Sequence, residues 1–334
     1  MNFNTAFKKL SLSQQLDVVY LMATLTGAFL QGSFPKKSLS IGPHAFRVIH
    51  GEARSKRRDR DLLIKEGILN EKDPRFATIP HNNPVYCGII HKRLFKKFKG
   101  ARLSTIINVG NSSPKAILIP LTLKGKNGKG TVLPTIPNVS PLGNKHFVFF
   151  ALPERLNGER VLRKQVHHSD TVYWISDFLT QLNDPDYNGF FNPINSGNSE
   201  DLLHVQYLKE QFPFFDMISE QNVKDDLTFI DKSHWPFEGW LLRYPANTPH
   251  KELYLEKLNK KIEEYINKGN NYNLLFHSTG DYHELYLAYR GENPVKLKVN
   301  NTLVNIAGYE VAGNIILEDK ELYDNIRELS WYYE

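Results

Sequence analysis

Short runs of β-branched and aromatic residues, each bounded by Gly, Asn or Pro, constrain the fold of this chain more than any other feature. Such runs are typical of β-strands closed by turns. They fall into two groups, and helical patterns accompany both. The first group comprises residues 103–109, 115–123, 145–153, 187–194 and 202–208, and the second comprises residues 272–278, 283–290, 295–299 and 309–318. We therefore expect an α+β fold made of two similar halves.

The spacing of apolar residues predicts a helix in each group and another at the C-terminus. The first helix covers residues 169–182, with Ser169 as its N-cap. The second begins near Pro249, since proline suits the first helical turn, and ends at Gly269. The last runs from Asp319 to Tyr333. Each half would thus have a helix to cover its strands.

The first 83 residues indicate a mostly helical region. Apolar residues between Leu16 and Ala23 recur at roughly helical spacing, and Asp17 interrupts any signal-peptide core. The sequence has no run of about 18 apolar residues, so we expect no membrane span and no membrane partner. The expected parts are a helical N-terminal region at 1–83, a first half at 84–220 and a second half at 221–334.

Composition and charge limit the class of protein. Of the 334 residues, 41% are hydrophobic and 12% are aromatic, which supports a packed core. The single cysteine, Cys87, excludes an internal disulfide and a thiolate metal cluster, and it fits a reducing, cytoplasmic location. The net charge of +6 favours anionic ligands. The basic stretches at residues 54–60 and 91–97 indicate either solvated helix faces or a nucleic-acid patch, but zinc-finger spacing and RNP-type aromatic motifs are absent.

A turn of small polar residues precedes an apolar stretch that carries His204 and Gln206. Side chains alternate along a strand, so residues 202, 204 and 206 would share one face and residues 203 and 205 the other. Two interpretations follow. In one, the stretch is an edge strand with two polar side chains in water. In the other, a phosphate loop leads into a strand that presents a histidine nucleophile.

The second interpretation has a chemical basis. A neutral imidazole can attack phosphorus to form a covalent phosphoramidate. An amide two residues later, on the same face, can donate a hydrogen bond to a non-bridging oxygen. Unlike a second histidine, it cannot readily supply a proton. The N–H groups of a turn of small residues can hold the remaining negative charge.

The stretch from Asn192 to Gln206 resembles the active-site strand of the histidine-triad-like superfamily. The resemblance is to the branch of galactose-1-phosphate uridylyltransferase, diadenosine tetraphosphate phosphorylase and GDP-hexose (GDP-L-galactose) phosphorylase. Members have a loop of small residues followed by His-x-His-x-Gln. This sequence has, in the same order, Asn192, Gly197, Asn198, Ser199, His204 and Gln206.

Three further stretches resemble GDP-hexose phosphorylases in the same order. Residues 137–154 are similar to their Asn-x-x-Pro-x-x-x-x-His strand, and residues 167–179 to their histidine-containing turn and long helix. Residues 306–326 resemble the closing Gly-x-x-Glu-x-x-Gly segment. The resemblance covers roughly residues 135–330. It implies two histidine-triad-like halves with antiparallel sheets and flanking helices.

By this resemblance, His204 is the nucleophile, and Gln206 favours transfer or phosphorolysis over hydrolysis. The implied phosphate- and nucleotide-binding residues are Gly197, Asn198, Ser199, Asn192, Asn138, His168 and Arg290. One departure is Leu202, which stands where the motif has its first histidine. The acids Glu200 and Asp201 lie beside the implied anion loop and would have to turn outward.

Several of these residues have structural interpretations as well. His167 and His168 at a helix entry either bind or position a nucleotide or have a structural role. Arg290 either meets phosphate or forms an ordinary ion pair. His146, on the strand expected to neighbour the site, is either a site residue or a buried core histidine. No spacing of His, Asp or Glu specifies a metal, so we assign no metal and no cofactor.

The leading hypothesis is a nucleotidyltransferase or phosphorylase that forms a nucleotidyl-histidine. Its substrate would be a nucleoside diphosphate sugar or a dinucleotide, and its acceptor inorganic phosphate or a phosphate-bearing molecule. The alternative is a catalytically degenerate protein that binds a nucleotide or sugar nucleotide, which Leu202 supports. A basic nucleic-acid-binding protein is the least favoured hypothesis, because it depends on the basic stretches alone. The oligomeric state does not follow from the sequence.

Overall fold

The structure is a computed structural model. It describes residues 9–25, 34–51, 119–138, 141–151, 154–156, 159–161, 165–197, 203–218, 225–291 and 296–332. The expected strand at residues 103–109, the basic stretches at 54–60 and 91–97, and Cys87 lie outside these described residues.

A nine-stranded sheet forms the centre of the molecule, and every neighbouring pair in it is antiparallel. In spatial order its strands are β10 (Leu227–Ile230), β11 (Gly239–Pro245), β13 (Tyr282–Gly291), β12 (Asn271–Ser278), β8 (Asn188–Phe191), β9 (His204–Leu208), β5 (Phe147–Phe150), β4 (Gly130–Pro137) and β3 (Ile119–Lys124). A separate hairpin joins β6 (Glu154–Leu156) and β7 (Glu159–Val161).

The sheet consists of two similar halves that meet where β8 pairs with β12. The first half runs β4, β5, α6 (Ser169–Leu182), β8 and β9 along the chain. The second runs β10, β11, α8 (Lys251–Ile266), β12 and β13. From the junction outward, the strand order is β8-β9-β5-β4 on one side and β12-β13-β11-β10 on the other. The α+β fold with two antiparallel halves is therefore confirmed.

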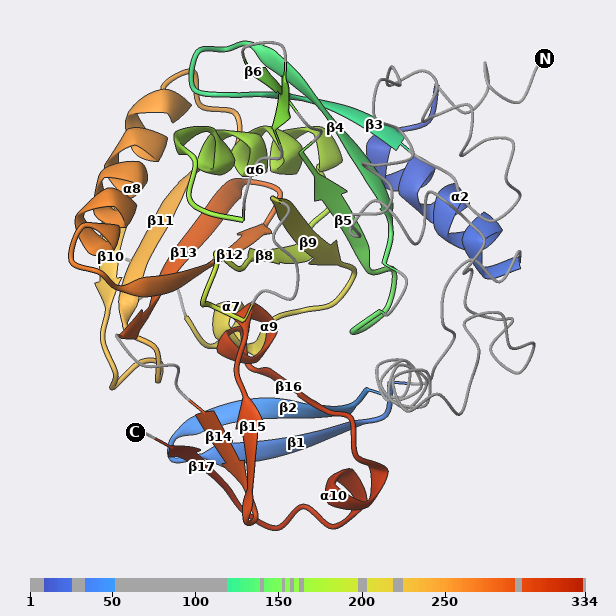
Figure 1. Ribbon diagram of the computed structural model, residues 1–334, viewed down its shortest axis with the longest axis vertical. Coiled ribbons are helices and arrows are strands. Elements are labelled where there is room, and N and C mark those ends of the chain that lie inside the picture. The colour runs from blue at the N-terminus through green and yellow to red at the C-terminus, as the bar shows by residue number, and fades with distance from the viewer. Residues whose placement is uncertain are drawn as a thin grey trace.

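Helices cover one face of this sheet, as Figure 1 shows for α6 and α8. The apolar side chains of α6 lie in one core with those of α8, α2 (Leu12–Leu25) and the facing strand residues. Helix α6 has the predicted bounds, but its N-cap is His168, one residue before the expected Ser169. It ends at Asn183, whose left-handed backbone (φ 45°) stops the helix.

Smaller elements cover the opposite face (Figure 1). They are α7 (Pro213–Met217), α9 (Gly308–Val311), α10 (Lys320–Asp324), a sheet of β1 (Lys36–Ile41), β2 (His44–His50) and β16 (Asn314–Leu317), and a sheet of β15 (Thr302–Asn305), β14 (Lys296–Val299) and β17 (Leu329–Tyr332). Strand β16 runs parallel to β2, so the C-terminal part of the chain completes a sheet that the N-terminal part begins.

The described part of residues 1–83 contains helix α2 and, at residues 36–50, the β1–β2 hairpin. Two sequence expectations were wrong in the C-terminal part. The expected strand at 309–318 begins as helix α9. The helix that starts after Asp319 ends at Asp324, and residues 329–332 pair with β14 as a strand. In each case pairing or packing with a distant segment outweighs local propensity. Among the helices that the structure describes, none is long and apolar enough to cross a membrane.

Candidate functional site

Strand β9 separates its side chains onto two faces as the alternation predicts. Leu203 and Val205 belong to the core on the helix side, and Leu208 belongs to the core on the opposite side. His204 and Gln206 share the parity of Leu208 and therefore face away from α6. His204 is 4% exposed, whereas Gln206 is half-buried. The interpretation as a solvated edge strand is wrong, because β9 is a central strand between β8 and β5.

The buried amide of Gln165 holds the backbone of His204. Its Oε1 accepts a hydrogen bond from the His204 N–H at 2.6 Å, and its Nε2 donates to the His204 carbonyl at 2.9 Å. The same Nε2 donates to the Asn192 carbonyl at 2.8 Å. The β8–β9 ladder ends at Phe190 and Gln206, so Gln165 bridges the two strands where they separate. Gln165 is not among the residues predicted from the sequence, because a single glutamine in a loop carries no recognisable signal.

Asn192 anchors the turn after β8 to the second half of the molecule. Its Oδ1 accepts hydrogen bonds from Asn273 Nδ2 at 2.8 Å and from the Gly308 N–H at 2.9 Å. Asn273 Nδ2 also donates to the Ser196 carbonyl at 2.9 Å. Asn192 is 3% exposed, so its side chain lies inside the protein at the base of the loop.

Arg290 continues this buried network. Its Nη1 donates to Asn273 Oδ1 at 2.9 Å and its Nη2 to the Ile306 carbonyl at 2.8 Å. It is 3% exposed, and burial lowers the pKa of its guanidinium to about 10, with Glu310 opposing the shift. The two Nη groups of Arg290 thus link β12 to the segment before α9.

Gly197 is the one residue of the implied phosphate loop that the structure describes. Its φ of +88° favours glycine, and an added Cβ would lie 2.5 Å from the Cβ of Ala307. The backbone at Gly197 therefore lies directly against the start of α9. Asn198 and Ser199 lie outside the described residues, as do Glu200, Asp201 and Leu202.

The histidine pair lies on the approach to α6, near Gln165. His168 is the N-cap of α6 and makes no side-chain capping hydrogen bond. The His167 Nδ1 lies 3.1 Å from the Tyr272 hydroxyl. Burial, with His168 adding to it, lowers the pKa of His167 to about 4.

Asn138 lies away from His204. Its backbone N–H donates to the His146 carbonyl at 2.8 Å, and His146 is fully buried, with Nδ1 accepting from the Leu142 N–H at 3.0 Å. His146 is thus a buried core histidine. The strand partner of His204 is Phe150, four residues further along the chain. At about 3.3 Å per residue, this places the His146 backbone roughly 13 Å along the strand from His204.

Comparisons with known proteins match the fold. No protein-family model and no curated protein sequence matches this chain. Among solved structures, it is similar to yeast Ap4A phosphorylase Apa2 in complex with AMP, with a TM-score of 0.54, 14% identity and coverage of 93% of this chain and 89% of that chain. The same yeast enzyme in complex with Ap4A gives a TM-score of 0.53 at 15% identity, covering 94% and 91% of the two chains. This protein therefore shares the fold of a yeast Ap4A phosphorylase over nearly its whole length.

Proposed function

We propose that this protein is a nucleotidyltransferase or phosphorylase that forms a nucleotidyl-histidine at His204. The observation that carries the proposal is the support of His204. The Gln165 amide bonds both the N–H and the carbonyl of His204, at the point where the loop from Asn192 leaves the sheet. The fold shared with a yeast Ap4A phosphorylase supports a dinucleotide as substrate, and a nucleoside diphosphate sugar is the other substrate class.

In the proposed reaction, the His204 imidazole attacks the α-phosphorus of the bound substrate. A phosphorus–nitrogen bond forms as the phosphorus–oxygen bond to the departing nucleotide or sugar phosphate breaks. Inorganic phosphate or a phosphate-bearing acceptor then attacks the same phosphorus and releases the histidine. Gln206, on the same face two residues later, donates to a non-bridging oxygen. The loop of Gly197, Asn198 and Ser199 supplies backbone N–H groups to the developing charge.

The buried residues Arg290, Asn273 and Asn192 have a positioning role in this proposal. Arg290 bonds Asn273, Asn273 bonds Asn192, and Asn192 accepts from the Gly308 N–H at the start of α9. We assign these residues to positioning the loop against α9, since their described hydrogen bonds are made within the protein. His168 is proposed to contribute to nucleotide binding from the entry of α6, and Asn138 from the end of β4.

Labelling of the protein tests the proposal directly. Incubation with Ap4A labelled at the α-phosphate, followed by denaturation and intact-mass measurement, should reveal one bound nucleotidyl group on the wild-type chain. His204→Asn should abolish the label. His234→Asn is the matched control, because His234 is an exposed histidine whose side chain pairs with Asp231. Equal labelling of the His204→Asn variant would contradict the assignment.

A binding protein without turnover is the second candidate. Leu202 in place of the first motif histidine and the low exposure of His204 favour it. It predicts a thermal shift with Ap4A or a sugar nucleotide in the presence of phosphate, with no product and no covalent label. Product release that depends on phosphate would exclude it.

A further inference from the structure

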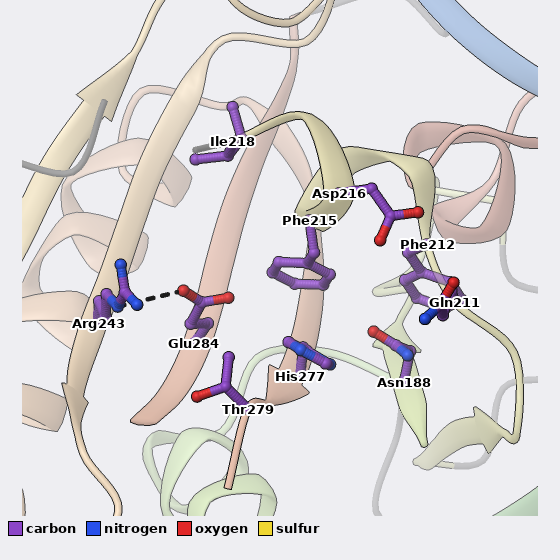
Figure 2. A pocket seen from close by; sticks show the side chains of 10 residues that line it. All are labelled: Asn188, Gln211, Phe212, Phe215, Asp216, Ile218, Arg243, His277, Thr279 and Glu284. Carbon is purple, nitrogen blue, oxygen red and sulfur yellow. Dashed lines mark ion pairs between the residues drawn. The ribbon is translucent and has the colours of Figure 1, made fainter. Parts of the chain in front are cut away.

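A second polar site lies on the same face of the sheet as His204, where the two halves meet. Asn188, His277, Glu284 and Arg243 stand directly opposite one another on β8, β12, β13 and β11. They line a pocket of about 290 Å³, which Phe215 and Asp216 of α7 border (Figure 2). In the second half, β11, β12 and β13 hold the places that β5, β8 and β9 hold in the first. Arg243, His277 and Glu284 thus lie on the counterparts of the strands around His204, and Asn188 joins them from β8.

The Asn188 side chain is the most direct evidence for ligand recognition at this pocket. It is 1% exposed, and neither its Nδ2 nor its Oδ1 has a hydrogen-bond partner. The buried amides of Asn192 and Asn273 are, by contrast, engaged in hydrogen bonds. Buried polar atoms are nearly always paired, so an amide with both atoms unpaired at a pocket wall is a candidate recognition group. His277 Nδ1, the next position in the row, is also buried without a partner.

The walls of the pocket favour a planar, uncharged group. Phe215 of α7 lies over the His277 ring, with centroids 5.0 Å apart and planes at 30°. Arg243 is paired with Glu284 at 3.4 Å, and Asp216 with Arg47 at 3.1 Å. A bound phosphate would therefore be repelled by the carboxylates of Glu284 and Asp216, and the Arg243 guanidinium is already paired with Glu284. Burial lowers the pKa of His277 to about 4, which keeps this ring neutral at pH 7.

We propose that this pocket binds the base of a purine nucleoside, with the Asn188 amide pairing to an adjacent donor and acceptor on the base. An asparagine amide matches the amino group and ring nitrogen of adenine in this way. The volume is near the lower end of small-ligand sites, so it suits a nucleoside better than a dinucleotide. The proposal does not depend on the function proposed for His204.

Photolabelling separates this site from the one at His204. Wild-type protein irradiated with 2-azidoadenosine should carry the label within residues 211–218 or 277–284, as mapped by peptide mass spectrometry. Excess adenosine should suppress this label. Purine riboside, which lacks the amino donor, should need at least a tenfold higher concentration. Labelling confined to residues 192–206, or equal competition by both nucleosides, would overturn the proposal.

Variants test the role of Asn188. Asn188→Leu, which is similar in shape but has no amide, should lower the labelling at least tenfold. Asn301→Leu is the control, because Asn301 is an exposed asparagine in the groove between β15 and α10. Ile218→Trp, which fills the pocket from its rim and leaves Asn188 intact, should also abolish labelling. The His204→Asn protein should carry as much 2-azidoadenosine label within residues 211–218 or 277–284 as the wild type. Full labelling of the folded Asn188→Leu or Ile218→Trp protein would refute the site.

Discussion

Gln165 shows how one side chain completes the proposed catalytic strand. Its amide makes three hydrogen bonds across the gap between β8 and β9, where the backbone ladder has ended. An amide group can replace a peptide unit in this way because it carries a carbonyl acceptor and N–H donors of similar geometry. The position of the His204 backbone therefore depends on a residue 39 positions earlier in the chain.

We predict that Gln165→Leu destabilises the protein by about 2–4 kcal/mol. The change removes the three hydrogen bonds of the Gln165 amide to the His204 N–H, the His204 carbonyl and the Asn192 carbonyl, and each such loss costs roughly 1–3 kcal/mol, with partial relaxation. Urea unfolding measures the effect. Gln181→Leu, at an exposed amide that donates to the Thr122 carbonyl and the Asp177 carboxylate, should cost less than about 1 kcal/mol. Equal costs for the two variants would mean that Gln165 is not an anchor.

The same variant tests the proposed chemistry. If Gln165 positions His204, nucleotidyl labelling of the Gln165→Leu protein by Ap4A should fall at least tenfold under conditions where the protein remains folded. Gln165→Asn, which keeps an amide on a shorter side chain, should recover part of the loss. Labelling at the wild-type rate would limit Gln165 to a role in stability.

At the scale of elements, the β12–β13 hairpin contains a buried histidine that should make stability depend on pH. His283 is 2% exposed, and its ring nitrogens lie 3.1 Å from the hydroxyl oxygens of Ser278 and Thr180. Burial, followed by Lys251 and His277, lowers its pKa to about 4. Between pH 6.5 and 4, the unfolded chain binds a proton at this histidine that the folded chain does not, so stability falls as the pH falls.

We expect His283→Gln to make this acid-induced loss shallower. Over the interval from pH 6.5 to 4, His283 accounts for up to about 3 kcal/mol of the loss in the wild-type protein. Chemical denaturation at pH 7, 6, 5 and 4 gives the slopes of both proteins. His250→Gln, at an exposed histidine just before α8, is the control for histidine content and should leave the slope unchanged. Parallel slopes for wild type and His283→Gln would contradict the prediction.

At the scale of the whole molecule, the two halves form one continuous sheet. The pairing of β8 with β12 joins them, and the core on the face opposite α6 takes side chains from β2, β9, β12 and β16 together. The predicted boundary at residue 220 falls between α7 and β10, where the chain passes from one half to the other. A cut there would expose the edge of β12 and divide this core.

We therefore predict that neither residues 1–220 nor residues 221–334 fold alone. Each fragment should aggregate or give an unfolded circular dichroism spectrum, because an exposed apolar sheet edge promotes association. Co-expression of the two fragments should restore a soluble complex of the size of the intact chain on size-exclusion chromatography. A monomeric, folded fragment would show instead that the half is an autonomous domain.

The sequence by itself determined the local elements whose signals are short in range. The apolar stripe of α6, the run of strands in both halves and the alternation along β9 follow from side-chain period and turn residues, and the structure has them. These features depend on neighbours within a few positions, so a single segment contains the information.

Only the tertiary structure decided the remainder. The strand at residues 329–332 exists because β14 pairs with it, and the β1–β2 hairpin is completed by β16 from the other end of the chain. The anchor Gln165, the enclosure of Arg290 and the row from Asn188 to Arg243 likewise join segments distant in sequence. Hydrogen bonds and burial of this kind depend on which segments meet in space, and no local pattern contains that information.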